Sequence, residues 1–266
     1  MRIPPLEHGF ICPNSFLYMY CQVCLHPDFV CDGYKQCPHQ DDELLCGLVC
    51  PSGCICQGLA FICPNTFNTS LYPQLRFLDA SGSLLHPSDL SHNTLLIHLN
   101  LSNCHLHNLI LPILPNLLVL DLSWNSITDL HMDSFSMLTN LNFLILSNNP
   151  IYKLSSDTVS SNKKIILLDL SSTLLQKLER TAFMCCPNVK HLNLFDTPIQ
   201  YLPQTVFSKN QLIETLDFRF DSDFEQAPKN LLINLKYLDN VKTNNFRFCC
   251  PVMLPNGFNY KNCRYF

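Results

Sequence analysis

The segment Leu117-Leu-Val-Leu120-Asp-Leu122-Ser-Trp-Asn125-Ser-Ile127 has a close copy in Leu141-Asn-Phe-Leu144-Ile-Leu146-Ser-Asn-Asn149-Pro-Ile151. Both follow the frame Leu-x-x-Leu-x-Leu-x-x-Asn-x-Leu, in which isoleucine or valine replaces some of the leucines. The copies of this frame, weaker ones included, begin at Leu75, Leu96, Leu117, Leu141, Ile165, Val189, Ile213 and Leu235. Successive copies start 21 to 24 residues apart, and such a period indicates a solenoid of stacked units.

The frame and its period identify the leucine-rich repeat. Each repeat is expected to add one short strand to a curved parallel sheet, with its leucines inward and its asparagine bonded to backbone at the turn. We therefore predict an α/β fold, a leucine-rich-repeat solenoid of about eight repeats over residues 75–245, with an irregular or short-helical convex side. Because one repeat cannot bury its apolar face alone, both ends of the array need covers.

Cysteines are concentrated at the two ends of the repeats. The 266 residues include sixteen cysteines, a content that favours an oxidising compartment. Cys104 and Cys186 occupy inward repeat positions, where we expect buried thiols. Either Cys249 or Cys250 is expected to bridge to Cys263 as part of the C-terminal cover.

The first cysteine-rich segment, residues 12–46, is too short to bury a core that would fold alone. Disulfides must supply part of its stability. Its acidic residues Asp32, Asp42 and Glu43 also suit a calcium ion, which takes six to eight hard oxygen ligands. The alternative is a disulfide knot whose acidic side chains only face water.

The run Cys24-Leu-His-Pro-Asp-Phe-Val-Cys31-Asp-Gly-Tyr-Lys-Gln-Cys37, followed by Asp42-Glu43 and Cys46, resembles a low-density-lipoprotein receptor class A module. The resemblance implies disulfides between Cys12 and Cys24, Cys21 and Cys37, and Cys31 and Cys46. It implies calcium ligands from Phe29, Asp32, Tyr34, Gln36, Asp42 and Glu43. Gln36 and His39 stand where the family usually has acidic residues, which weakens the implied site.

A second cysteine pattern, Cys50-x3-Cys54-x-Cys56-x6-Cys63, resembles the N-terminal cap of extracellular leucine-rich repeats. The resemblance implies that Cys50 pairs with Cys56 and Cys54 with Cys63, in a cap over residues 50–74. Phe246-x-Phe248-Cys249 resembles the hinge that follows the repeats in leucine-rich-repeat G-protein-coupled receptors, and residues 246–266 are expected to form this C-terminal cap.

The order of a class A module and a capped repeat array is similar to that of relaxin-type receptors and related invertebrate receptors. The resemblance implies the extracellular, hormone-binding region of a G-protein-coupled receptor. Only Gly47, Leu48 and Val49 separate Cys46 from Cys50, whereas relaxin receptors have a longer linker there that helps to bind hormone. The alternative is a secreted or adhesion-type binding protein without a signalling domain.

One residue of each predicted strand points out of the concave face between two inward leucines. In order along the chain these residues are Asp79, Asn100, Asp121, Ile145, Asp169, Asn193, Asp217 and Asp239. This acidic series predicts a cationic peptide or protein ligand, with candidate contacts at Asp121, Asp169, Asp217, Phe143 and Phe195. The alternative is that aspartate is common here because it is soluble and hydrogen-bonded at this repeat position.

Other classes of function are disfavoured. The net charge of −4 and the lack of a basic stripe argue against nucleic-acid binding. No Gly-rich phosphate loop or nucleophile elbow is present, and His105 and His107 should lie on a turn while Cys104 faces the core, so we expect no enzyme.

The expected location is the extracellular side of the plasma membrane, with secretion as the alternative. No secretory signal and no stretch of eighteen apolar residues is present, so we expect an incomplete N-terminus and membrane attachment only through segments outside these residues. Asn68, in Asn-Thr-Ser, is the expected glycosylation site, whereas a glycan on Asn100, in Asn-Leu-Ser, would obstruct the concave face.

Overall fold

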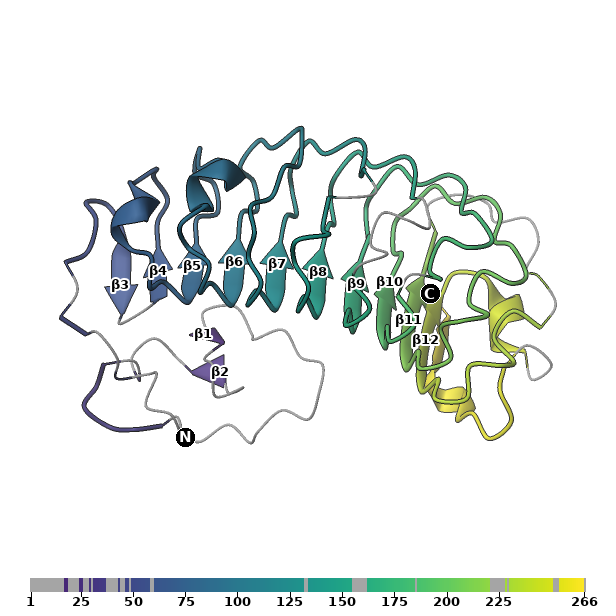
Figure 1. Cartoon of the computed structure of the whole chain (residues 1–266). Coiled ribbons are helices and arrows are strands. Elements are labelled where there is room, and N and C mark those ends of the chain that lie inside the picture. Colours follow the sequence, from purple (N-terminus) through teal and green to yellow (C-terminus); the bar gives the residue numbers. More distant parts are fainter. Residues whose placement is uncertain are drawn as a thin grey trace.

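Parallel strands, one from each repeat, form a long sheet in the computed structural model of the chain (Figure 1). The structure describes residues 17–18, 24–25, 29, 31–36, 43, 46–47, 49–57, 60–131, 134–154, 162–184, 186–220, 228, 230–250 and 254–265. The repeat strands are β5 (Phe77–Asp79), β6 (His98–Asn100), β7 (Val119–Asp121), β8 (Phe143–Ile145), β9 (Leu167–Asp169), β10 (His191–Asn193), β11 (Thr215–Phe218) and β12 (Asn240–Thr243).

Strands from the caps extend the sheet at both ends. The hairpin of β3 (Ile55–Gln57) and β4 (Ala60–Ile62) is antiparallel, and β4 then pairs in parallel with β5. At the other end β13 (Cys263–Tyr265) pairs in parallel with β12, which gives eleven strands in the order β3 to β13. Separately, β1 (Leu17–Tyr18) and β2 (Cys24–Leu25) form a two-stranded antiparallel pair.

Between the strands the chain is mostly irregular, as Figure 1 shows. In the described ranges the short helices are of the 3₁₀ type, namely η2 (Thr69–Leu71), η3 (Pro87–Leu90), η4 (Phe246–Cys249) and η6 (Tyr260–Asn262). The predicted fold class is confirmed: a leucine-rich-repeat solenoid with a parallel sheet and few helices. In the described part of the chain, no helix is both long and apolar enough to span a bilayer.

The leucines of the frame form the core because the strands pair in register. Leu120, Leu144, Leu168, Leu192 and Leu216 stack along the sheet, and none of them is more than 2% exposed. Alternate residues of a strand point to opposite faces, so the residues on either side of each central leucine lie on the concave face. The repeat frame therefore fixes which side chains a ligand can reach.

The asparagine of the frame bonds consecutive repeats together. Asn149 is 2% exposed, and its Nδ2 donates to the carbonyls of Leu122 at 2.8 Å and Leu146 at 3.0 Å. Its Oδ1 accepts from the backbone N–H of Ile127 at 3.1 Å. Thr173 fills the same slot in the next repeat and donates one such bond, to Leu170 at 2.8 Å. The slot thus needs a buried donor to backbone, whichever residue supplies it.

A second row of asparagines, not anticipated from the frame, lies on the other side of the core. Asn162 Nδ2 donates to the carbonyls of Phe135 and Leu138, at 3.0 and 2.7 Å. Asn210, two repeats later, makes equivalent bonds to the preceding repeat. Between them Cys186 occupies the same position and is fully buried, as expected.

Disulfides close both ends of the solenoid. The structure pairs Cys50 with Cys56 and Cys54 with Cys63, the pairs implied by the resemblance to extracellular repeat caps. At the C-terminal end Cys249, rather than Cys250, pairs with Cys263. Because Cys263 begins β13, this bridge ties the last strand to η4.

In the first module the structure pairs Cys31 with Cys46. The other two implied bridges, Cys12–Cys24 and Cys21–Cys37, involve residues outside the described ranges.

Candidate functional site

The strand register corrects the concave series at its C-terminal end. Asp217 in β11 lies opposite Lys242 in β12, and Lys242 lies opposite Arg264 in β13. The prediction that Asp239 ends the series is therefore wrong, and the row continues with two basic residues. Asp239 precedes β12, is exposed, and accepts a hydrogen bond from Asn262 Nδ2 at 2.9 Å.

The last repeat places Lys242 on the concave face instead of Asp239 because its frame is shifted. The inward residue is Val241, which is fully buried, so the last copy of the frame begins at Leu238 and not at Leu235. The shift from Leu235 to Leu238 is an odd number of residues, so it moves every side chain of the strand to the opposite face. Asn240, polar where the earlier frame requires an inward leucine, is the signal that could have revealed the shift.

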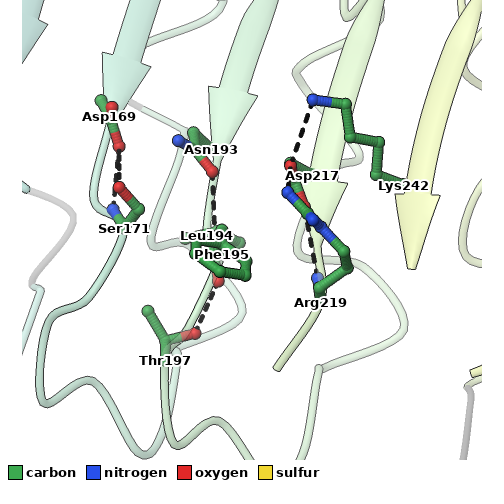
Figure 2. A network of polar contacts seen from close by, with 9 residues as sticks. All are labelled: Asp169, Ser171, Asn193, Leu194, Phe195, Thr197, Asp217, Arg219 and Lys242. Carbon is green, nitrogen blue, oxygen red and sulfur yellow. Dashed lines mark hydrogen bonds and ion pairs between the residues drawn. The ribbon is translucent and has the colours of Figure 1, made fainter. Parts of the chain in front are cut away.

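Most acidic and amide residues of the series cap the turn that follows their strand. Asp121 Oδ1 accepts from the backbone N–H of Ser123 at 2.8 Å and from its Oγ at 2.6 Å. Asp169 makes the same pair of bonds to Ser171, at 2.9 and 2.7 Å, as Figure 2 shows. Oδ1 of each carboxylate thus binds the following turn, while Oδ2 remains available for a ligand.

The apolar side chains in the N-terminal half of the concave face are buried. Val119 is 5% exposed, Phe143 6% and Ile145 8%. Phe143 lies on the concave side as expected, but it is buried, so it does not offer the exposed aromatic contact that the sequence suggested. Asp121 is in this half, and burial raises its pKa, with smaller contributions from the Asp79 and Asp169 charges.

The C-terminal half is open and hollowed. A concavity of about 440 Å³ lies over β9 to β12, lined among others by Leu167, Asp169, Asn193, Thr215 and Lys242. We call it the β9–β12 groove. Its lining mixes an aliphatic side chain, a carboxylate, an amide, a hydroxyl and an ammonium.

Asp217 is held between two cations at the C-terminal side of the groove (Figure 2). Arg219 binds it through Nε at 2.9 Å and Nη2 at 2.6 Å, and Lys242 Nζ lies 3.5 Å from Oδ2. The hydrogen bond to Asp217 raises the pKa of the Arg219 guanidinium, which stays charged. The charge of Asp217 is therefore already balanced within the chain, and its role as an anchor for a cationic ligand stays a prediction.

Phe195 and Arg219 form a pair at the edge of the groove. The guanidinium carbon of Arg219 lies 4.3 Å from the centroid of the Phe195 ring, a cation–π contact. Phe195 is 39% exposed, so it remains accessible to a ligand, as expected. Earlier repeats have serine at the equivalent position, for example Ser123 and Ser171, so this pair is specific to the C-terminal half.

Two histidines on the concave face are neutral at neutral pH. Burial lowers the pKa of His98 to about 4, against the opposing effect of the Asp79 charge, and its ring stacks on Phe77. Burial also lowers the pKa of His191, whose Nδ1 lies 2.8 Å from Thr215 Oγ1. Neither imidazole therefore offsets the acidic residues beside it.

The single tryptophan of the chain lies just beyond β7, at an unusual backbone position. Trp124 has φ 57° and is 65% exposed. The equivalent positions are occupied by Gly82, Asn103, Asn148, Ser172 and Asp196, all with positive φ. A bulky residue is rarely found in this conformation, and such exceptions cluster at binding sites.

Two of the proposed calcium ligands bind the loop of residues 31–36. Glu43 accepts from the backbone N–H of Asp32 at 3.0 Å and of Gly33 at 3.1 Å. Asp32 accepts from the backbone of Tyr34 and from Gln36 Nε2, both at 2.8 Å. These hard carboxylate oxygens suit calcium, and each keeps a lone pair for a metal.

The calcium set is only partly described. Asp42 lies outside the described ranges, and within them no three His, Cys, Asp or Glu side chains converge as a metal site. Phe29 and Tyr34, the predicted carbonyl ligands, are both exposed. Calcium therefore stays a prediction.

Asn68 is exposed at the start of η2, where its Oδ1 accepts from the backbone N–H of Ser70 at 3.2 Å. Its place outside the sheet suits the predicted glycan. Asn100 lies half-buried on the concave face in β6 and accepts from the backbone N–H of Ser102 at 2.9 Å. Cys104 is buried, and its thiol donates to the carbonyl of Ala80 at 3.2 Å.

Comparison with known proteins supports the repeat assignment. Residues 112–151 and 144–199 match the leucine rich repeat family. No curated protein matches the sequence. The functional domain of InlJ from Listeria monocytogenes, which includes a cysteine ladder, is 24% identical with a TM-score of 0.52, over 67% of this chain and 36% of that chain.

A chain of the Toll–Spatzle complex from Drosophila is 20% identical with a TM-score of 0.58. The match covers 64% of this chain and 23% of that chain. At these identities the likeness establishes the fold, and this chain spans only a minor part of the length of either structure.

Proposed function

We propose that this chain is an extracellular recognition domain that binds a peptide or protein ligand in the β9–β12 groove. The observation that carries the proposal is the contrast within one sheet: the apolar residues of the concave face are buried in its N-terminal half, whereas the C-terminal half is hollowed and lined by varied polar groups. Repeat arrays present such concave surfaces to macromolecular partners. Toll, in its complex with Spatzle, is a protein of the same fold with a bound protein partner.

An extracellular location follows from the cysteine chemistry. Among the described residues four disulfides form, and three of them lie in the caps of the solenoid. Such bridges persist in secreted proteins and on cell surfaces and are reduced in the cytosol. A scaffold that carries recognition rather than chemistry fits this setting, and we propose no catalytic role.

The finer proposal is a hormone-binding region of a receptor related to the relaxin-type G-protein-coupled receptors. It rests on the order of a class A-like module, a cysteine cap, repeats and the Phe246-Arg-Phe248-Cys249 segment. The alternative, a secreted or adhesion-type binding protein, uses the same groove. The full transcript separates them, because the receptor requires seven apolar spans after Phe266 and a stop codon there favours the secreted form.

Binding in the groove is testable even though the natural ligand is unidentified. Random 12-residue peptides displayed with free carboxyl termini are selected on the whole chain, and the enriched peptides are synthesised. Leu167→Arg places a bulky cation in the groove, while Ile113→Arg makes the same kind of change at an exposed aliphatic residue outside the sheet. We expect the first variant to abolish binding of most selected peptides and the second to leave it intact.

Both variants must first show the far-ultraviolet circular dichroism and the unfolding midpoint of the parent chain. If Leu167→Arg folds normally and retains the selected peptides as well as Ile113→Arg does, the groove is not the binding site.

A further inference from the structure

We propose that Lys242 and Arg264 form a carboxylate-binding subsite at the C-terminal end of the β9–β12 groove, which receives an acidic residue or the terminal carboxylate of a peptide ligand. This inference rests on the proposed function and adds the orientation of the ligand in the groove. The ligand lies across the strands, with a carboxylate at β12 and β13 and its basic residues toward Asp169 in β9.

The first support is the reversal of charge along one row of the sheet. Asp169, Asn193, Asp217, Lys242 and Arg264 follow each other in direct register across β9 to β13. Neighbouring strands are about 4.8 Å apart, so the acidic and basic ends of the row are separated by only a few residues of an extended peptide. A ligand that bridges them must carry charges of both signs.

The second support is that Lys242 is not needed by Asp217. Arg219 already satisfies both oxygens of that carboxylate, at 2.9 and 2.6 Å, whereas Lys242 Nζ is 3.5 Å away and its side chain is 40% exposed. Lys242 can therefore turn to a ligand without leaving a buried carboxylate unpaired. Breaking a satisfied buried ion pair would be costly, and here that cost does not arise.

The third support is the state of Arg264. It lies beside Lys242 on the same face, and its side chain is exposed. Within the described residues no ion pair to Arg264 is formed. Two cations side by side, with the carboxylate of Asp217 neutralised by Arg219, leave a net positive end to the groove.

The surroundings favour a carboxylate over a polyanion. The chain carries a net charge of −4, and Asp169 lines the same groove as Lys242. A phosphate-rich ligand that reached along the groove would meet that carboxylate and be repelled, whereas a single carboxylate between two cations gains charge-assisted hydrogen bonds. Asn240, which also lines the groove beside Lys242, provides a neutral partner next to the two cations.

The test uses the selected peptides whose binding Leu167→Arg abolishes. The double variant Lys242→Gln/Arg264→Gln removes two exposed charges from the row, and Lys163→Gln/Lys209→Gln removes two exposed charges from loops outside the strands. We expect the first pair to weaken binding of carboxylate-bearing peptides about tenfold and the second to change it by less than about twofold. Both double variants should keep the parent unfolding midpoint, because all four side chains are solvent-accessible.

The peptides identify the source of the carboxylate. Each is remade with its acidic side chains as amides, or with an amidated C-terminus. If the carboxylate that occupies the subsite is the one replaced by an amide, the modified peptide should bind the parent chain about tenfold more weakly than the original peptide. The same replacement should not further weaken binding to Lys242→Gln/Arg264→Gln. Weaker binding of the peptide with side-chain amides identifies an acidic side chain as the ligand group, and weaker binding of the peptide with an amidated C-terminus identifies the terminal carboxylate.

Two results would overturn the subsite. One is that groove-binding peptides lack any carboxylate requirement, and the other is that Lys242→Gln/Arg264→Gln acts no more strongly than its charge-matched control. In either case the sensitivity of binding to Leu167→Arg still stands as evidence for the groove. If Leu167→Arg itself has no effect, the proposed function fails instead.

Discussion

Asp121 illustrates how a single side chain serves both the fold and a surface. One of its oxygens caps the turn at Ser123, and the rest of the carboxylate is a partly buried charge whose pKa burial raises. Asn100 and Asn193 accept the equivalent backbone bond at 2.9 and 3.1 Å without a charge. The repeat position thus requires an oxygen acceptor, and the negative charge of Asp121 is an addition to that requirement.

Asp121→Asn is therefore expected to stabilise the fold at neutral pH. A raised pKa means that the folded chain binds the proton more tightly than the unfolded chain, so stability from this group is lost as pH rises above 3.8. Removing the charge should add about 0.5–1 kcal/mol to the free energy of unfolding at pH 7. The gain should fade toward pH 3, where the carboxyl is protonated in both states. Denaturant titrations at the two pH values measure it, and a loss of stability at pH 7 would contradict this account.

Trp124, at the end of β7, is a second residue whose replacement should stabilise the fold. We expect Trp124→Asn to raise the free energy of unfolding by about 0.5 kcal/mol, because asparagine tolerates positive φ better than tryptophan does. As the sole tryptophan, it also serves as a fluorescence probe: a ligand that extends from the β9–β12 groove to β7 should shift its emission to shorter wavelength. If Trp124→Asn is clearly destabilising, the exposed ring has a packing role that its 65% exposure does not suggest.

At the scale of the repeat, the buried asparagine determines how firmly consecutive units are joined. Asn149→Ala removes a donor and an acceptor and leaves the carbonyl of Leu146 and the N–H of Ile127 unpaired, while the carbonyl of Leu122 keeps its bond from Asn125. We expect a loss of about 3 kcal/mol in urea unfolding. Thr173→Ala, in the same slot one repeat later, removes the hydroxyl bond to Leu170 and should cost about 1 kcal/mol. Equal losses in the two variants would show that the asparagine network does not distinguish these repeats.

Sequence reasoning succeeds where the side-chain period is strong and fails where one residue is inserted. The leucine frame predicts β5 to β11 and their register, because every shift would expose a buried leucine. The last repeat has Val241 and Thr243 at its inward positions, so its weaker pattern allowed a slip that hid Lys242 from the concave series. The ion pair between Asp217 and Arg219 could not be predicted either, because the repeat period shows which face a side chain lies on but not which side chain it pairs with.

For the whole molecule, we propose that calcium acts on the first module and not on the solenoid. Glu43→Gln should weaken calcium binding at least about tenfold, because it removes a charged ligand and loosens the loop that Glu43 holds. Glu179→Gln, an exposed acid among the repeats, is the matched control. Calorimetric titration of the whole chain with calcium chloride measures both. Absence of binding at millimolar calcium would leave the module as a disulfide knot alone.

The solenoid as a whole then presents a polar recognition surface with direction. Its N-terminal half has buried apolar residues beside Asp121, its C-terminal half holds the open groove, and the groove ends at the basic residues Lys242 and Arg264. The expectation of a purely cationic ligand follows from the acidic residues alone. The register of β11 to β13 adds Lys242 and Arg264 to the row, and we therefore propose a ligand of mixed charge instead.

The most direct test of the groove as the binding site is a glycan placed inside it. Phe195→Thr creates the acceptor Asn193-Leu-Thr in β10, and Lys236→Thr creates Asn234-Leu-Thr outside the strands. Both variants are secreted from glycosylating cells, checked for occupancy by mass, and compared for binding of the selected peptides before and after enzymatic removal of the glycan. We predict that the Asn193 glycan abolishes binding and its removal restores it, while the Asn234 glycan has no effect. Undiminished binding to the fully occupied Phe195→Thr chain would contradict the account.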